Sequence, residues 1–440
     1  MADSPNGAEV PSASVGESAR FVVWHLLPNY LQGLFSRRPK WVGRLASLDV
    51  DRRSTELLSS IRERTDAEVL WVLGGKMLLV FGREPIAEVL DNSGTRFGSD
   101  SGAKKKGMCH FQPHAVTIST GEEWKQRRAF NEAVLCTAER VHPLADRFAA
   151  IAAEETALAV QEAAGDLRWE HIDTLHEKMM LRVVFGDRAR DDHQLVARLQ
   201  RLMHEANRVA ALSESDDFEP FHQALRDYLS DPPEDCLLGR AAKAPEIDDP
   251  AGQIPHWMFA MGDTLALNVA QAVIAVLSQP EVEATVHDEL EGADLDKACD
   301  VDGLRQLEGC LEEAMRLWPT TPVLARESMC EQHLAGAKLS EGTPVMIVNT
   351  FNHRDSRTVA DADHVVPERW RGSERDPRFN HLSGGSQICA GIGLTVFLGK
   401  AVLATLLRDR DLKLREPQLA EGPLPHKIDP FSLRVGVEPS

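Results

Sequence analysis

The chain has 440 residues, of which 43% are hydrophobic and 27% are charged. A chain of this length and composition can bury a large core, so we exclude a disordered or fibrous protein. The formal net charge of −19 disfavours binding to nucleic acid or anionic lipid, because both partners need a basic surface. The seven cysteines are scattered without a C-x-x-C pair, which is typical of a reduced cytoplasmic chain.

The N-terminal residues are polar and rich in Ser, Pro and Gly, and they predict a disordered tail over residues 1–19. The apolar stretch 21–35 is shorter than a bilayer needs and contains Pro28, so we predict no transmembrane anchor there. Basic residues after it leave peripheral membrane contact open, although we favour a helix packed on the protein's own surface. Without an interior linker, residues 20–440 are expected to form one domain.

Helical periodicity dominates the rest of the chain, with short strand-like runs at 69–80 and 344–348. The predicted fold class is therefore mainly α with a minor β part. The clearest helix begins at Pro255 and is stopped by Pro280. It is apolar almost all round, which predicts that it crosses the core of the protein.

Two polar residues, Asp263 and Thr264, fall in the middle of this apolar helix. A buried carboxylate is costly unless it is paired or functional, and a mid-helix Thr can bond to the preceding turn and bend the helix. Gly262 would ease such a bend. The pair indicates either a functional site or a kinked core helix whose Asp caps a local defect.

Cys389 lies in the Gly-containing loop FNHLSGGSQICAGIG, before a long C-terminal helix. Backbone N–H groups at a helix N-terminus favour a thiolate over a thiol. Small neighbours would let the backbone approach a flat ligand; they are Gly384, Gly385, Ala390 and Gly391. A thiolate in such a loop is a haem ligand or a nucleophile, although a lone cysteine is more often a small buried hydrophobe.

The order of several motifs resembles that of the cytochrome P450 family, in particular its soluble, bacterial-type members, over nearly the whole chain. E-x-x-R alone recurs by chance on helices, so the resemblance depends on the series. In chain order the motifs are Trp124 and Arg128 in GEEWKQRR, Asp263 and Thr264 in AMGDT, Glu313 and Arg316 in LEEAMRLWP, Arg369 in VVPERW, and Cys389.

The resemblance implies the cytochrome P450 fold, with a long central helix across a heme b whose iron is bound by Cys389. It implies that Trp124, Arg128 and Arg326 face the haem propionates, although Arg326 could instead be a surface arginine at the start of a strand. Other implied cofactor contacts are Ala260, Leu382, Gly385 and Gly391. Glu313, Arg316 and Arg369 would form a structural charge triad, in which loss of one member leaves an unpaired buried charge.

The implied activity is that of a haem-thiolate monooxygenase, which inserts one oxygen atom from O2 into a hydrophobic substrate in specialised metabolism. Asp263 would feed protons, and Thr264 would hold dioxygen or a water. Electrons would come from a ferredoxin and ferredoxin reductase, with NAD(P)H used only indirectly. Candidate docking residues are Lys125, Arg127 and Lys400. An apolar substrate pocket is expected from Phe111, Val116, Leu265, Val323 and Leu324.

Some positions depart from the family pattern. Leu382 stands where an aromatic residue is common, Gln387 where Arg or His is usual, and Met261 where a small residue is frequent. Lys104, Lys105 and Lys106 could bind a substrate acid, but solvated lysines in a loop are the commoner explanation. Three alternatives stay open: a peroxygenase or an oxidase that couples rings or desaturates, a haem-dependent ligand-binding protein without turnover, and a helical protein without haem.

Overall fold

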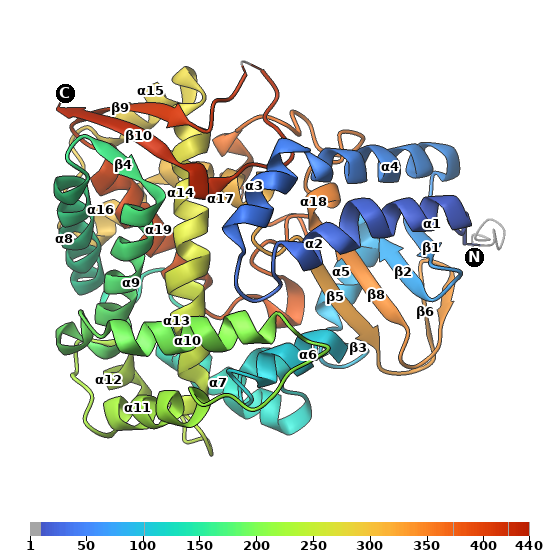
Figure 1. Ribbon diagram of the computed structural model, residues 1–440, viewed down its shortest axis with the longest axis horizontal. Coiled ribbons are helices and arrows are strands. Elements are labelled where there is room, and N and C mark those ends of the chain that lie inside the picture. The colour runs from blue at the N-terminus through green and yellow to red at the C-terminus, as the bar shows by residue number, and fades with distance from the viewer. Residues whose placement is uncertain (1–9, 101, 373, 421, 440) are drawn as a thin grey trace.

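The computed structural model describes residues 10–100, 102–372, 374–420 and 422–439. Helices account for most of the chain, and the strands form three small sheets. The predicted class, mainly α with a minor β part, is confirmed. In Figure 1 the largest sheet and the N-terminal helices lie on the right. The other long helices lie on the left, around the central helix.

The α-helices are α1 (Val15–Phe21), α2 (Leu27–Leu31), α3 (Pro39–Ser47), α4 (Val50–Thr65), α5 (Arg83–Asp91), α6 (Gly102–Cys109), α7 (Gly121–Leu135), α8 (Ala145–Ala163), α9 (Trp169–Phe185), α10 (His193–Ala206), α11 (Phe218–Ser230), α12 (Leu237–Ala241), α13 (Ile254–Phe259), α14 (Leu265–Leu277), α15 (Pro280–Leu290), α16 (Ala298–Gly303), α17 (Arg305–Leu317), α18 (Asn349–Asn352) and α19 (Ile392–Leu407). The strands are β1 (Val69–Val72), β2 (Met77–Val80), β3 (Phe97–Gly98), β4 (Asp166–Arg168), β5 (Val323–Ser328), β6 (Gln332–Leu334), β7 (Ala337–Leu339), β8 (Pro344–Val348), β9 (Arg410–Glu416) and β10 (Arg434–Pro439).

The largest sheet has the strand order β1-β2-β8-β5-β3, in which only β2 and β8 run parallel. It contains the strands predicted over 69–80 and 344–348. Alternate side chains enter opposite cores: Leu78 and Ile347 pack on one side of the sheet, and Leu79 and Met346 pack on the other. Both faces are therefore covered, and Arg326 of β5 is buried.

The predicted disordered tail is wrong for the residues that the structure describes. Ser12 pairs with Trp71 of β1, and α1 begins at Val15. The Ser14 hydroxyl accepts from the Glu17 backbone N–H at 3.2 Å, and the Glu17 carboxylate accepts from the Ser14 N–H at 2.8 Å. This capping box starts the helix in spite of the polar composition around it. The rest of the predicted tail, residues 1–9, lies outside the described residues.

The apolar stretch after α1 continues as a helix through a π-helical segment, Val22–Leu26, into α2. One face packs on the protein through Phe21 and His25, which are buried. The opposite face leaves Val23, Leu27 and Tyr30 exposed. The helix packs on the protein's own surface, as we expected, with an apolar outer face.

The central helix runs from Ala251 to Leu277 and is broken by a π-helical segment at Ala260–Thr264. This is the distortion expected at Gly262 and Thr264, because a π-helical turn widens the backbone. By length and composition this helix could cross a membrane, and it is the one such helix among the described residues. In the most apolar stretch of this helix, 72% is buried inside the protein, as expected for a helix that runs through a core.

Candidate active site

The middle of the central helix is partly accessible, although the turns on either side of it are buried. Phe259, Ala260 and residues 262–264 are half-buried, whereas residues 265–276 are buried throughout. Residues 323–325 of β5 and residues 387–393 around Cys389 are half-buried in the same way. A flat cofactor held between the helix and the cysteine loop would contact partly accessible segments of this kind. Single π-helical turns are frequent at such functional sites.

The cysteine loop is held by its own backbone. The Cys389 N–H donates to the Leu382 carbonyl at 2.9 Å, and the Ile388 N–H donates to the Gly385 carbonyl at 3.2 Å. Gly391 then caps α19, so Cys389 lies just before the helix, as predicted. Leu382, expected as a cofactor contact, thus orients the cysteine through its backbone.

The thiol of Cys389 is less acidic than its position before the helix suggested. Burial raises its pKa above the ordinary thiol value, while the Gly391 N–H and the charges of Arg128 and Arg375 lower it by less. The predicted stabilisation of the thiolate exists, but burial outweighs it. A coordinated metal ion reverses this balance, because it deprotonates a thiol ligand outright.

Helix α7 contacts the cysteine loop at two points. Arg128 donates from Nη1 to the Ile388 carbonyl at 2.6 Å and from Nε to Glu132 at 2.6 Å. The Thr137 hydroxyl, just beyond the helix, donates to the Ala390 carbonyl at 2.5 Å. Trp124 lies one turn before Arg128 and is half-buried. The structure therefore brings Arg128 to the residue next to Cys389.

Arg326 is buried in β5 with 4% of its surface exposed, so the alternative of a surface arginine is wrong. Its guanidinium donates to the Ser93 hydroxyl and to the Ala325 carbonyl, both at 2.9 Å. No carboxylate pairs with it within the described parts of the chain, and burial lowers its pKa to about 10. A buried cation without a counter-charge fits an anionic group such as a haem propionate.

Lys104 adds a second cation near Arg326. It donates to the carbonyls of Ser99 at 3.0 Å and Thr117 at 2.9 Å. Burial, and then the charge of Arg326, lowers its pKa to about 7. The expectation of a solvated lysine is wrong for Lys104, whereas Lys105 is exposed and pairs with Asp100 at 3.0 Å.

Gly385 was expected at the cofactor, but the structure gives it another role. It is exposed, its φ is +56°, and a Cβ on it would lie 2.4 Å from the backbone carbon of Leu90 at the end of α5. Gly385 therefore allows the cysteine loop to touch α5. Gly391, by contrast, leaves ordinary space for a Cβ, with Leu135 nearest at 3.6 Å.

We expect Gly385→Ala to lower the free energy of unfolding by about 1–3 kcal/mol, because the new methyl group forces backbone apart at a strained φ. Urea denaturation followed by circular dichroism measures this difference. Gly303→Ala is the control, since nothing lies within 4 Å of its Cβ position. Equal stabilities for the two variants would show that the contact with α5 is not a constraint.

The predicted pocket residues do not share one surface. Phe111 and Val116 are buried, and Phe111 packs edge-on against Phe35 with ring centroids 6.0 Å apart. Leu265 is a wrong prediction: it is fully buried and faces α19, where a Cβ on Gly399 would lie 3.4 Å from its side chain. One residue along a helix turns the side chain by about 100°, so Leu265 points away from the side of Thr264.

The last two predicted pocket residues, Val323 and Leu324, follow each other in β5 and are half-buried. Val323 packs on the core cluster of Leu79, and Leu324 packs on the core cluster of Leu78. Successive side chains of a strand point to opposite faces, so the two residues cannot line the same wall.

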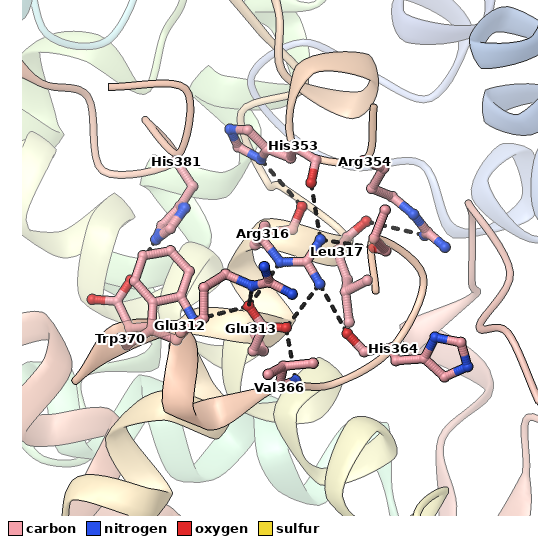
Figure 2. A network of polar contacts seen from close by, with 12 residues as sticks. Glu312, Glu313, Arg316, Leu317, His353, Arg354, His364, Val366, Trp370 and His381 are labelled. Atoms are coloured by element: carbon pink, nitrogen blue, oxygen red, sulfur yellow. Dashed lines mark hydrogen bonds and ion pairs between the residues drawn. The ribbon is translucent and has the colours of Figure 1, made fainter. Parts of the chain in front are cut away.

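Glu313 and Arg316 meet near the end of α17 (Figure 2), and the structure brings Arg369 to the same carboxylate. Glu313 and Arg316 are fully buried and form a bidentate pair at 2.7 and 2.8 Å. Arg369 donates to the same carboxylate at 3.2 Å. Glu313 also accepts from the Trp370 indole N–H and the Val366 backbone N–H, both at 2.9 Å.

Arg316 also binds the backbone of residues 353–364, which precede the cysteine loop in the chain. Its remaining N–H groups donate to the carbonyls of His353, Ala362 and His364 at 2.8–2.9 Å. Every nitrogen of the guanidinium is therefore bonded, as a buried charge requires. The triad acts as a fixed point for residues 353–366 (Figure 2).

Sequence reasoning missed a second buried acid beside the triad. Glu312 accepts from His381 at 2.5 Å and from Arg375, and Arg375 lies over the Trp370 ring at 5.3 Å. His381 begins the turn that precedes Cys389 in the chain. The only sequence signal was the doublet Glu312–Glu313 at the end of an apolar helix, and the partners are too distant in sequence to be inferred from it.

Two of the three docking candidates are wrong. Lys400 is buried and binds Glu308 at 2.8 Å, and Arg127 is buried against Ser119 at 2.6 Å. Both serve the protein's own packing, which a residue's charge alone does not reveal. Lys125 is exposed and pairs with Glu122 at 3.1 Å.

Asp263 points to an acidic recess between the central helix and α9. Asp173 and Glu177 line this recess, whose volume of about 10 Å³ is enough for about one water. Burial, and then the charges of Asp173 and Glu177, raises the pKa of Asp263 to about 7. Glu177 also binds the largely exposed His193 at 2.7 Å. Acidic groups thus connect Asp263 to the surface, a link that the sequence did not suggest.

Comparison with known proteins agrees with this site. Residues 235–427 match the family described as Cytochrome P450. The chain is 28% identical over 177 residues to cytochrome P450 4V2 of Rattus norvegicus, which covers 37% of this chain and 33% of that protein. It is 32% identical over 178 residues to cytochrome P450 81F4 of Arabidopsis thaliana, covering 38% and 36%. The probable cytochrome P450 313a5 of Drosophila melanogaster is 29% identical over 177 residues, covering 37% and 36%.

The structure is that of a helical protein with a π-helical distortion in its core helix, a cysteine loop before its last helix, and buried cations. Residues 235–427, which include the central helix, α17 and Cys389, match the cytochrome P450 family. The matches span about a third of the length of these curated relatives. A match to this family implies a haem whose iron is bound by a cysteine thiolate. Arg326, a buried cation without a carboxylate partner among the described residues, fits the anionic propionates of that group.

Proposed function

We propose that the protein is a haem-thiolate monooxygenase that inserts one oxygen atom from O2 into a hydrophobic organic substrate, in specialised metabolism. The observation that supports this proposal most is the pair Asp263 and Thr264, which lies half-buried at the π-helical segment of the central helix. A haem bound there supplies the activation of dioxygen.

The chain's own residues would hold the cofactor and supply protons. Cys389 would bind the iron, and Arg128, Arg326 and Lys104 would pair with the propionates. Asp263, with a pKa of about 7, can hold a proton at neutral pH and release it to a water beside Thr264. Glu177 and His193 would replace that proton from solvent, through the water that the acidic recess can hold.

The activity is tested with the purified protein, NADPH, a plant-type ferredoxin with its reductase, and labelled 18O2 over a panel of apolar organic compounds. The proposal expects product that carries one labelled oxygen and depends on the ferredoxin. Product formed only with hydrogen peroxide would favour the peroxygenase. Ligand binding without any consumption of O2 would favour the non-catalytic binding protein.

The proton supply should make the reaction depend on pH. Because the pKa of Asp263 is raised to about 7, its carboxyl is mostly protonated at pH 6 and mostly ionised at pH 8. Product formed per NADPH consumed should therefore fall as the pH rises through 7, and in Asp263→Asn it should be low and flat. Stability should also depend on pH, because ionisation of Asp263 is disfavoured only in the folded state: it should fall as the pH rises from about 4 to about 7 and level off above that.

A second variant gives the direction of the shift. Asp173→Asn removes a like charge beside Asp263, so the midpoint of the pH profile should move to lower pH. An unchanged profile in Asp263→Asn would contradict the assignment of Asp263 as the proton donor. The measurement is the ratio of product to NADPH between pH 5.5 and 8.5.

We propose a ferredoxin as the electron donor and a cytoplasmic location. Support for the location comes from the sequence, in the net charge of −19 and the free cysteines. Lys125 remains the exposed docking candidate, and Lys125→Glu should slow reduction by ferredoxin at low salt, since exposed charges act mainly on association. Stopped-flow reduction at two salt concentrations measures this effect.

A further inference from the structure

A second cavity lies beside the central helix, beyond Thr264. Leu267 and Gln271 of α14 line it, and both lie on the same helix face as Thr264, three and seven residues further on. Seven residues span about 10 Å of helix. The opposite wall contains Thr320, just before β5, and residues 426–428 near the C-terminus. One end of the cavity, at Leu267, therefore lies one helical turn from Thr264.

The cavity contains one cation more than its carboxylates neutralise. Arg37 donates to the Thr320 carbonyl at 2.6 Å and to the Gly33 carbonyl at 3.1 Å, and over the described ranges no carboxylate pairs with it. Lys427 is neutralised by Asp51 at 3.1 Å. Burial, and then the charge of Arg354, lowers the pKa of His426 to about 4, so this residue is neutral at pH 7.

Arg37 keeps its charge in this cavity. Burial lowers its pKa to about 10, which still leaves the guanidinium protonated at pH 7. Its hydrogen bonds go to two neutral carbonyls. Among the described residues in the wall, the one carboxylate is Asp51, whose charge acts on Arg37 but which bonds to Lys427, so one positive charge remains in excess. An arginine in such surroundings favours a planar anion, which it can bind with two parallel hydrogen bonds.

Two buried side chains in the wall have polar atoms without a partner. Among the residues that the structure describes, the Thr350 hydroxyl and the Gln271 side-chain oxygen have no hydrogen-bond partner, and these residues are only 6% and 7% exposed. Both line the cavity. Thr350 can donate to an anion, and so can Gln271 once its amide is turned over. Groups of this kind are normally satisfied, so their position indicates a polar ligand.

The rest of the cavity limits the shape of that ligand. Its volume of about 60 Å³ admits a group as large as a carboxylate but not a whole organic molecule. Leu267, Trp318 and Phe431 provide apolar walls around the polar end. The ligand should therefore have a small anionic head and an apolar body that continues along the central helix.

We propose that the substrate is an organic acid whose carboxylate binds Arg37, Thr350 and Gln271, with its apolar body directed toward Thr264. This inference rests on the proposed function and names the substrate class for it. Arg37 is a binding and specificity residue in this account. The carboxylate would supply the counter-charge that the wall of the cavity lacks.

Calorimetric titration of the haem-loaded protein with decanoate and with 1-decanol tests the inference without turnover. The wild type should bind decanoate more tightly than decanol. Arg37→Gln should weaken decanoate binding about tenfold or more, as expected for loss of a charge-assisted bond, and should leave decanol binding unchanged. Arg38→Gln is the control, because this neighbour bonds to the Leu31 carbonyl and does not line the cavity.

Thr350→Val keeps the test decisive if Arg37→Gln does not fold. It removes an unpaired hydroxyl at nearly constant shape and should weaken decanoate binding several-fold, with decanol unaffected. Equal affinity of the wild type for the acid and the alcohol, or decanoate binding that neither variant weakens, would overturn the inference. If either of these results occurs while the carbon monoxide spectrum shows thiolate ligation, the proposed function stands and only the substrate class is wrong. If the spectrum shows no thiolate ligation while the protein still prefers the acid, the result counts only against the proposed function.

Discussion

Glu313→Gln is expected to lower the free energy of unfolding by about 3–5 kcal/mol, the usual cost of a buried charge that has lost its partner. Arg316 is fully buried and binds both oxygens of Glu313. An amide in the same place carries no charge, and its NH2 group would face the donors of Arg316, Arg369 or Trp370. Urea denaturation at pH 7 measures the loss.

Glu368→Gln is the matched control for this variant. Glu368 follows Val366 and Pro367 in the same segment, is half exposed, and pairs with Arg371 at 3.2 Å. An exposed pair contributes about 0–1 kcal/mol, so this variant should be near the wild type in stability. Similar losses for the two variants would show that the triad is not the fixed point that its contacts suggest.

The pair Glu313 and Arg316 could be predicted from the sequence because the two residues are close together in the chain. Glu313 and Arg316 are one helical turn apart, which places them on one face of any helix. What the sequence could not predict is the set of carbonyls that receive Arg316, since these lie in residues 353–364 and meet the helix only in the folded chain. The central helix was predictable for the same local reason, and its bend was indicated by Gly262 and Thr264.

Residue type alone gave the wrong burial for several basic side chains. Three cations that the sequence predicts to be exposed are instead bonded to other parts of the protein; they are Lys400, Arg127 and Lys104. Long basic side chains can be buried when carbonyls or carboxylates receive them, and that depends on contacts between distant segments. Leu265 was misplaced because its helix face was not known from the sequence.

Other features were present in the sequence and were overlooked. Ser14 and Glu17 have the S-x-x-E spacing of a capping box, directly before an apolar run. The acids of α9 fall one turn apart, at Asp173 and Glu177, but their meeting with Asp263 depends on how two helices pack. The cavity at Arg37 joins the N-terminal segment to the C-terminal one, so no local pattern could have revealed it.

Cys389→Ser is expected to abolish thiolate ligation completely, the largest effect that this account predicts. Serine preserves the size of the side chain and the loop, including the N–H bond to the Leu382 carbonyl, but it is a far weaker ligand for iron. Cys310→Ser is the matched control, because this buried cysteine lies in α17 rather than in the cysteine loop. Burial raises its pKa, so it should remain a thiol.

The difference spectrum of the reduced protein with carbon monoxide tests the central claim most directly, because it reports the axial ligand of the haem iron. We predict the red-shifted band of a thiolate-bound haem in the wild type and in Cys310→Ser, and its loss in Cys389→Ser. A protein that takes up no haem, or a band that persists in Cys389→Ser, would contradict the assignment of Cys389 as the iron ligand.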